Sequence, residues 1–146
     1  CMKRVRIKSK DLPVDYPVSK KDAVEKCKTD EYTFYTINGV PSFFEYDNTT
    51  LPTLKCLLQQ LILPTVTVDM GAVRFVVNGA DIMGPGITAF SAGVSEGDYV
   101  VVVDETHGKP LAVCKSLISS EHFMKGMGGK VLANVHYVGD KLWNVL

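Results

Sequence analysis

A glycine-rich turn near the middle of the chain has the residue types that could bind an anion. The stretch contains Gly84-Pro85-Gly86, a bend that residues with a Cβ would resist. Backbone without side chains lets a sugar–phosphate chain approach closely, while free amides face its phosphates. The same residues are also typical of a helix end followed by ordinary turns. The candidate contact residues here are Asn78, Gly79, Ala80, Met83, Gly84, Pro85, Gly86 and Ile87.

Cations near this turn can supply charge for the same ligand. Arg74 can anchor a phosphate through its forked donors, or it can form a solvated pair with Asp69 or Asp81. Lys115 interrupts an apolar strand pattern. Either its ammonium adds a phosphate contact, or its presence means that the candidate binding cleft has a different shape. Two lysines among glycines form a flexible basic segment or an exposed helix end with favourable cations, namely Lys125 and Lys130.

The charge of the chain is unevenly distributed although its net charge is zero. Residues 1–28 carry nine lysines and arginines against four carboxylates, whereas residues 29–60 and 61–146 have net charges of −3 and −2. A nucleic acid would be drawn to the first segment, and the acidic remainder favours a shaped, local site. Cations alternate along this segment at Arg4, Arg6 and Lys8. They form an electrostatic footprint on RNA, or they protect an edge strand against unwanted pairing.

The groups needed for catalysis or metal binding do not assemble in this sequence. The four cysteines include no Cys-x-x-Cys pair and only three histidines accompany them, so neither a zinc site nor a disulfide framework is expected. We assign no role to Cys1 and expect the other thiols to be reduced and mostly buried. Without a nucleophile beside a base or a cofactor loop, we expect no enzyme activity and no cofactor. Short apolar runs and the lack of a secretory signal predict a cytoplasmic protein with no membrane partner.

The first 63 residues read as a small α+β domain. Residues 2–8 alternate and predict a half-buried strand, and Ser19 predicts the cap of a helix that continues to Cys27. Asn38-Gly39 favours positive φ at both positions and predicts a type I′ hairpin between strands 31–37 and 40–46. A loop at 47–50 then leads to a helix that begins at Pro52. Its apolar stripe is Leu54, Leu57, Leu58 and Leu61.

Residues 64–146 read as a second domain, since Pro64 ends the preceding helix. Asp69 predicts the cap of a helix whose apolar face is formed by valines and Ala80. Gly139-Asp140 predicts the turn of a final hairpin that ends at residue 146. Many short strands with brief helices predict a small, partly closed β-barrel behind the α+β domain. Its other predicted elements are strands at 65–68, 99–103, 111–117, 131–138 and 141–146 and a short helix from Ser119 or Ser120.

Several of these residues resemble the PUA domain, the RNA-binding module named after pseudouridine synthases and archaeosine transglycosylases. The resemblance rests on the helix that leads into Gly84-Pro85-Gly86, on Gly97-Asp98 before a strand, and on the run from His136 to Trp143. Leu51-Pro52-Thr53-Leu54 and Ile62-Leu63-Pro64 are similar to the malignant-T-cell-amplified-sequence family and its archaeal relatives, in which a small domain precedes the PUA domain. The resemblance implies a pseudo-barrel whose helix and glycine loop line an RNA-binding cleft.

The resemblance also implies a function. It suggests a non-catalytic protein that binds structured RNA, either tRNA or rRNA, through shape and backbone and acts in translation initiation or ribosome recycling. The partners it implies are the small ribosomal subunit and an initiation-factor-like protein. One alternative is a protein-interaction adapter without RNA affinity, which the acidic balance and Cys114-Lys115 favour because related sequences carry glycine and a small apolar residue there. Another is an accessory subunit of an RNA-modification machinery.

Overall fold

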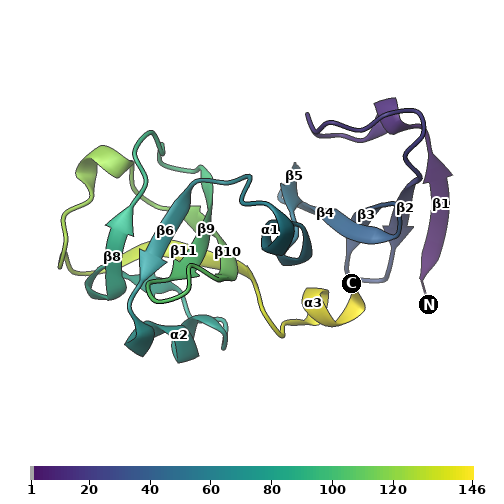
Figure 1. The fold of residues 1–146 in the computed structure, drawn as a ribbon. Coiled ribbons are helices and arrows are strands. Elements are labelled where there is room, and N and C mark those ends of the chain that lie inside the picture. Colours follow the sequence, from purple (N-terminus) through teal and green to yellow (C-terminus); the bar gives the residue numbers. More distant parts are fainter. Residues whose placement is uncertain (1) are drawn as a thin grey trace. The chain divides into compact units, whose positions relative to one another are not determined.

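A computed structural model describes residues 2–146, which form two compact units, so Cys1 lies outside the described residues. The division falls within a short helix, between Cys56 and Leu57. Each unit is built on its own sheet, with short helices at the ends of strands (Figure 1). This combination confirms the predicted α+β class. The boundary that the sequence predicts between residues 63 and 64 stays a prediction.

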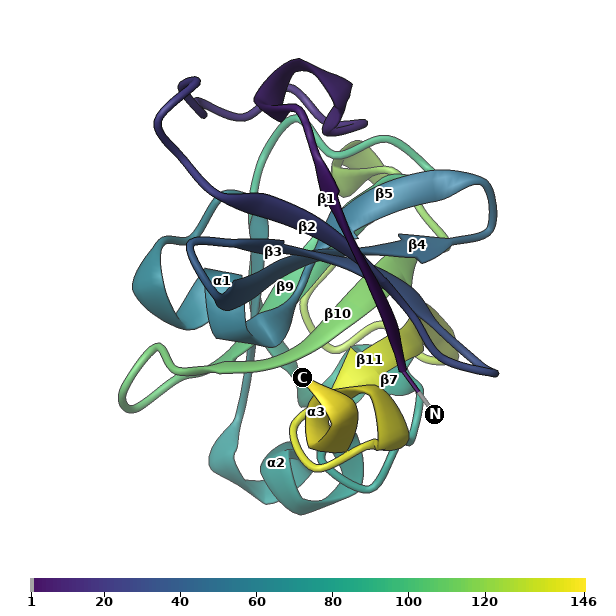
Figure 2. The ribbon, with the colours of Figure 1, turned by 90° about the vertical axis from the view of Figure 1, so that its right-hand side faces the viewer.

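The N-terminal unit is a five-stranded antiparallel sheet whose strands follow one another in sequence order. The first strand forms one edge of this sheet, as Figure 2 shows in purple. Its residues are mostly exposed, and Val5 is 48% exposed, so the predicted half-buried pattern is wrong there. The elements are β1 (Lys3–Ile7), η1 (Ser9–Asp11), β2 (Val24–Lys28), β3 (Thr33–Ile37), β4 (Val40–Tyr46), β5 (Thr49–Pro52) and α1 (Leu54–Gln59).

The hairpin of β3 and β4 forms the centre of this unit. Asn38 and Gly39 have φ angles of 51° and 80°, which confirms the predicted turn with two positive φ angles. Phe34 and Phe43 are fully buried, and the ring of Tyr16 meets Phe43 edge-on at a centroid distance of 5.1 Å. The aromatic residues of the hairpin therefore serve the core more than the surface.

The predicted helix from Ser19 to Cys27 is wrong. Ser19 and Asp22 form a tight turn in which the Ser19 amide donates to the Asp22 carboxylate at 2.8 Å, and the chain then enters β2. Val24 and Cys27 are both fully buried, but they point to opposite faces of the strand. One buried residue on each face gives a spacing of three, and this spacing imitates the apolar stripe of a helix.

The residues between β4 and α1 form a second hairpin instead of the predicted loop. Asp47 and Asn48 have φ angles of 48° and 60°, so they make the turn, and β5 follows at once. Pro52 ends this strand instead of beginning the helix. The hydroxyl of Thr53 accepts from the Cys56 amide at 3.1 Å and begins α1, which ends well before Pro64 and leaves Leu58 exposed.

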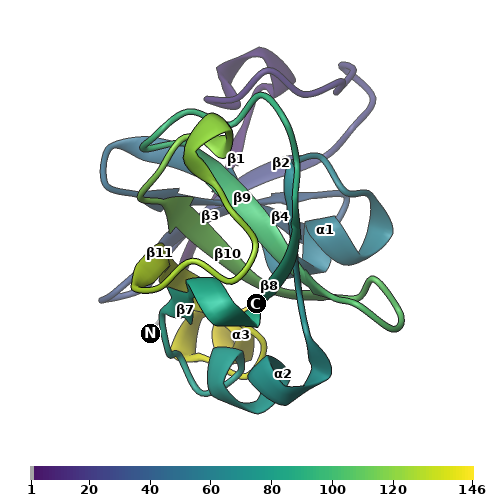
Figure 3. The same cartoon turned by 90° about the vertical axis from the view of Figure 1, so that its left-hand side faces the viewer.

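The C-terminal unit is a six-stranded curled sheet with the order β7-β11-β10-β9-β6-β8. β6 and β9 are parallel and all other pairs are antiparallel. The sheet curls on itself without closing, and α2 lies at one end of it (Figure 3). This confirms the predicted pseudo-barrel. The elements are β6 (Thr65–Val68), α2 (Met70–Val76), β7 (Ile82–Met83), η2 (Gly84–Gly86), β8 (Ile87–Phe90), β9 (Tyr99–Asp104), β10 (Pro110–Ser116), η3 (Ser120–His122), β11 (Lys130–Tyr137) and α3 (Lys141–Val145).

The end of the chain is a helix, α3, and the final strand predicted there is wrong. Gly139 has a φ of 91° and turns the chain, and the Asp140 carboxylate then accepts from the Trp143 amide at 2.6 Å. Asp140 also accepts from the Tyr137 amide and lies 2.9 Å from Nδ1 of the fully buried His136. Asp140 is therefore a helix cap, not a residue of a hairpin turn.

Candidate nucleic-acid interface

Helix α2 forms one wall of the candidate site. The Asp69 carboxylate accepts from the Ala72 amide at 2.9 Å, which confirms the predicted cap. Val76 is buried in the core of the unit, and Val73 and Val77 pack partly against that core. The helix stops where the sequence predicts, since Gly79 has a φ of 89° and the side-chain amide of Asn78 donates to the Arg74 carbonyl at 2.8 Å.

A groove of about 430 Å³ lies between α2 and the segment that leaves it. Its lining is mainly apolar, and two of its large apolar side chains are exposed, Phe75 at 55% and Met83 at 50%. A pocket of this volume is typical of small-ligand sites. The lining residues are Asp69, Gly71, Ala72, Phe75, Val76, Ala80, Asp81, Ile82, Met83, Pro85 and Gly86.

Strand β11 holds the second wall of the groove in place, and this wall is the segment 80–86 that follows α2. The Asn134 side-chain amide donates to the carbonyls of Val76 and Ala80 at 3.1 and 3.0 Å, and the Asn134 backbone amide donates to Asp81 at 2.8 Å. Asp81 also forms an ion pair with Lys130 at 2.9 Å. The Lys130 ammonium, followed by the Asn134 amide, holds the pKa of Asp81 below its ordinary value of 3.8. The turn after α2 is therefore fastened to the sheet at several points.

Three glycines near the groove are needed, two of them for packing and one for the groove itself. A Cβ on Gly84 would lie 2.0 Å from the Met127 carbonyl oxygen, and a Cβ on Gly79 would lie 2.9 Å from the Tyr137 ring. The Gly84 amide is also occupied, because it donates to the Gly129 carbonyl at 2.9 Å. Packing accounts for these two glycines. Gly86 lines the groove itself. A Cβ on Gly86 would lie 3.3 Å from the Ala72 methyl group, so the small size of this glycine keeps the groove open.

Arg74 stands beside the groove with its charge available. Its guanidinium lies over the Phe75 ring, 4.8 Å from the centroid. Asp69 caps the helix and Asp81 binds Lys130, so neither forms the ion pair with Arg74 that the sequence left open. Within residues 2–146 no carboxylate lies close enough to pair with this guanidinium.

The structure brings only part of the predicted contact set together. Ala80, Met83, Pro85 and Gly86 line the groove. Lys130 lies at its edge, opposite Met83 in the pairing of β7 and β11.

The remaining predicted contact residues lie elsewhere. Ile87 is buried in the core, and Lys115 is half-buried in β10 between Tyr99 and Ala133, outside the groove lining. Lys125 is exposed in the loop that precedes β11. The three cations of the first strand belong to the N-terminal unit, where Arg4 pairs with Glu25 at 3.8 Å and two others line a separate pocket, namely Arg6 and Lys8.

Phe75 is the groove residue that the sequence reasoning missed. It lies on the side of α2 opposite the apolar stripe, so neither the core pattern nor the search for cations selects it. The sequence did contain a signal for this site, because an aromatic side chain on the polar side of an amphipathic helix is not explained by burial in the core. Gly71 and Ala72 also line the groove and were missed. They are small residues that leave room for a ligand and have no side-chain donor.

Across residues 2–146 no three His, Cys, Asp or Glu side chains are grouped closely enough to bind a metal ion. Cys27, Cys56 and Cys114 are buried free thiols, as predicted, and burial raises the pKa of each. None of the helices described here is long and apolar enough to cross a membrane.

Comparison with known sequences places this architecture in a family. The PUA domain model matches residues 64–138, and the model of a domain of unknown function, DUF1947, matches residues 4–60. The uncharacterized protein MJ1432 of Methanocaldococcus jannaschii is 42% identical over 90% of this chain and 82% of its own length. Translation machinery-associated protein 20 of Saccharomyces cerevisiae is 33% identical over 90% and 77%. Malignant T-cell-amplified sequence 1 of Danio rerio is 37% identical over 86% and 73%.

Solved structures agree with the sequence comparison. A PUA domain protein of Aeropyrum pernix, crystallised with tartrate, superposes with a TM-score of 0.85 at 26% identity, over 99% of this chain and 91% of that one. An H/ACA ribonucleoprotein bound to a substrate RNA contains a chain that superposes with a TM-score of 0.52 at 25% identity, over 66% of this chain and 29% of that one. With a PUA domain preceded by the small N-terminal domain and with these relatives, this chain belongs to the malignant-T-cell-amplified-sequence family of PUA-domain proteins.

Proposed function

We propose that this protein is a non-catalytic RNA-binding protein of the translation machinery and that the groove beside α2 is its RNA contact. The observation that carries the proposal is the groove itself, with the exposed Phe75 ring in its lining and the unpaired Arg74 guanidinium above that ring. Relatives named for the translation machinery and a similar chain in a ribonucleoprotein support the assignment.

The groove suits an unstacked nucleotide with its phosphate. An aromatic ring offers a face to a base, and such stacking contributes about 1–3 kcal/mol. Arg74 extends from the same helix and can hold the adjoining phosphate through two parallel hydrogen bonds. The groove presents few polar atoms to a base edge, so recognition rests on shape and backbone. Structured RNA with an exposed end or loop, such as tRNA or rRNA, fits this description.

The proposed partners extend the family resemblance. A relative named for its association with the translation machinery supports a place in that machinery. The small ribosomal subunit is the proposed larger assembly, and an initiation-factor-like protein is the proposed protein partner. Within this proposal the protein is cytoplasmic and acts in initiation or ribosome recycling. The groove has no nucleophile beside a base, which supports a role in binding instead of catalysis.

A protein-interaction adapter is the second candidate, because the groove is apolar and the C-terminal residues 61–146 carry a net charge of −2. Binding of deacylated tRNA over a series of salt concentrations separates the two functions. An RNA-binding protein loses affinity steeply as salt rises, since its phosphate contacts release counterions. Absence of tRNA binding even at low salt would refute the RNA-binding proposal and favour the adapter.

A further inference from the structure

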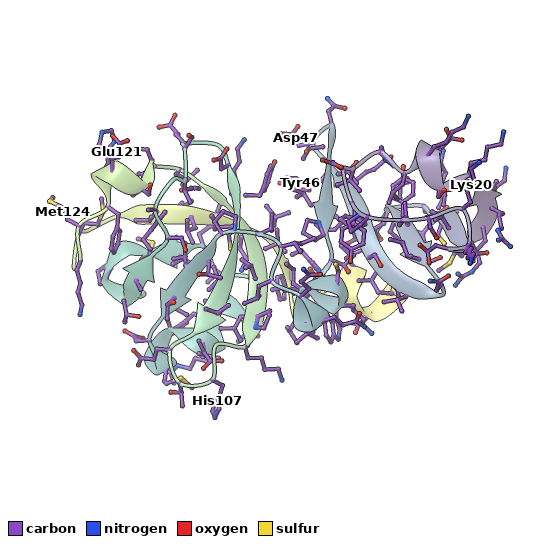
Figure 4. All side chains as sticks on the ribbon, turned by 45° about the horizontal axis from the view of Figure 1, so that its top comes forward. Lys20, Tyr46, Asp47, His107, Glu121 and Met124 are labelled. Carbon is purple, nitrogen blue, oxygen red and sulfur yellow. The ribbon has the colours of Figure 1, made fainter. Side chains whose placement is uncertain are left out.

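A second pocket lies in the N-terminal unit, and nothing in the RNA-groove proposal uses it. It has a volume of about 660 Å³ and lies where the end of β1, η1 and the turn before β2 come together. Figure 4 shows Lys20 in a part of this unit where nitrogen-tipped side chains gather. We call it the basic pocket, and its polar lining residues are Arg6, Lys8, Ser9, Lys10, Lys20 and Asp22.

The four cations of the basic pocket have no carboxylate partner. Over the described part of the chain, no ion pair includes Arg6, Lys8, Lys10 or Lys20. This is not so for Arg4 on the same strand, whose guanidinium lies 3.8 Å from Glu25 and 3.6 Å from the Cys27 sulfur.

The single carboxylate of the basic pocket is occupied by neutral donors. Asp22 accepts from the Ser19 amide at 2.8 Å and from the Asn38 side-chain amide at 3.0 Å. The Ser19 amide and then Asn38 lower the pKa of Asp22, so it stays ionised at neutral pH. Its role is to fix the turn that carries Lys20. The lining therefore keeps an excess of three positive charges.

This arrangement favours an anion of a particular kind. Converging cations repel one another, and an anion between them removes the repulsion and gains charge-assisted hydrogen bonds. The pocket offers ammonium, guanidinium and hydroxyl donors, with few acceptors to match the donors of a nucleobase. An ionised phosphate group has hydrogen-bond acceptors and no donors, so it matches these donors. The volume exceeds that of one phosphate and leaves room for the group to which it is esterified.

We propose that the basic pocket is a phosphate-binding site, separate from the groove beside α2, that takes the phosphate of a nucleotide or of an RNA strand. Arg6, Lys8, Lys10 and Lys20 hold the phosphate oxygens, and the Ser9 hydroxyl donates an additional hydrogen bond. Asp22 positions the turn and does not contact the ligand.

Titration of the full chain with inorganic pyrophosphate, followed by amide chemical shifts, tests the site. The amides of Ser9, Lys10 and Lys20 are expected to shift and those of the groove residues are not. The double variant Lys10→Ala/Lys20→Ala is expected to weaken pyrophosphate binding by about tenfold or more. The matched control Lys3→Ala/Lys28→Ala removes the same charge from an exposed, paired position of β1 and β2 outside the pocket and is expected to stay within about twofold.

The outcome separates a site from general attraction. Equal weakening in both double variants, or shifts spread evenly over exposed lysines, would overturn the proposal. The variant Phe75→Ala leaves pyrophosphate binding unchanged, so failure of the groove proposal and failure of this one are distinguishable.

Two RNA oligonucleotides of one sequence, with a 5′-phosphate and a 5′-hydroxyl, then identify the source of the phosphate. Weaker binding of both by Lys10→Ala/Lys20→Ala assigns an internal phosphodiester, and weaker binding of the first alone assigns a terminal phosphate. An effect confined to pyrophosphate, with neither oligonucleotide affected, would overturn the assignment to a nucleotide or RNA phosphate.

Discussion

Gly84 lies so close to Met127 that an added Cβ would fall 2.0 Å from the Met127 carbonyl oxygen. The Gly84 amide donates to the carbonyl of nearby Gly129, so the turn after α2 and the loop before β11 are joined through backbone. A glycine that the sequence suggests for ligand approach is thus required by packing. The Gly84–Gly129 hydrogen bond fixes the turn that contributes Met83, Pro85 and Gly86 to the groove.

The variant Gly84→Ala is therefore expected to destabilise the protein. The methyl group meets backbone that cannot rotate away, and overpacking of this kind costs about 1–3 kcal/mol or more. The midpoint of urea unfolding measures the loss. Gly128→Ala is the matched control, because nothing lies within 4 Å of its added Cβ, and it is expected to be near neutral. Equal stability of the two variants would contradict the close approach.

The ion pair between Asp81 and Lys130 predicts a pH dependence of stability. Because Lys130 lowers the pKa of Asp81 in the folded state, the carboxylate stabilises the protein above the unfolded pKa of 3.8, and this contribution is lost as pH falls through the lower folded value. Asp81→Asn lacks the contribution at all pH values. Urea unfolding at about pH 6 and about pH 2.5 is expected to give a larger difference between wild type and the variant at the higher pH. An equal difference at both values would contradict the linkage.

Local sequence signals predicted the elements that depend on neighbours in the chain. Asn38-Gly39 and the Asp69 cap were read correctly because a dihedral preference or a single carboxylate decides each of them. The strand β2 was not, because its burial at Val24 and Cys27 depends on strands on both of its sides. The periodicity of apolar residues within one segment does not tell which strands will pair with it.

The site was predicted in the same partial way. The sequence identified the helix and the turn, and the groove does lie between them. It did not identify Phe75, whose exposure becomes meaningful only when the groove beside it is seen. It also could not tell that Gly79 and Gly84 serve Tyr137 and Met127, since these partners lie more than 40 residues away in the chain.

Asp140 is expected to be the most important helix cap in the chain. Its carboxylate accepts from the Trp143 and Tyr137 amides and bonds the buried His136, whereas Asp69 accepts from one amide. Asp140→Ala is predicted to cost about 2–4 kcal/mol, from the lost cap and from the buried ring that loses this partner. Asp69→Ala is predicted to cost about 0.5–2 kcal/mol. Denaturant unfolding of both variants ranks them, and a larger loss for Asp69→Ala would refute the assignment.

The groove proposal makes its sharpest prediction at Phe75 and Arg74. Phe75→Ala is expected to weaken RNA binding by about 1–3 kcal/mol, because the base loses its stacking surface, with little change in salt dependence. Arg74→Ala is expected to weaken binding and to reduce the slope of log affinity against log salt by about one unit, because one phosphate contact is lost. Fluorescence anisotropy with labelled tRNA measures both.

The control for this pair of variants is Met124→Ala. Met124 is 69% exposed and lies outside the groove lining, so its removal changes exposed apolar area without touching the proposed contact (Figure 4). Its tRNA affinity is expected to equal that of the wild type. A salt slope left unchanged by Arg74→Ala, together with equal losses for Phe75→Ala and Met124→Ala, would mean that RNA binds elsewhere and that the groove serves a different ligand.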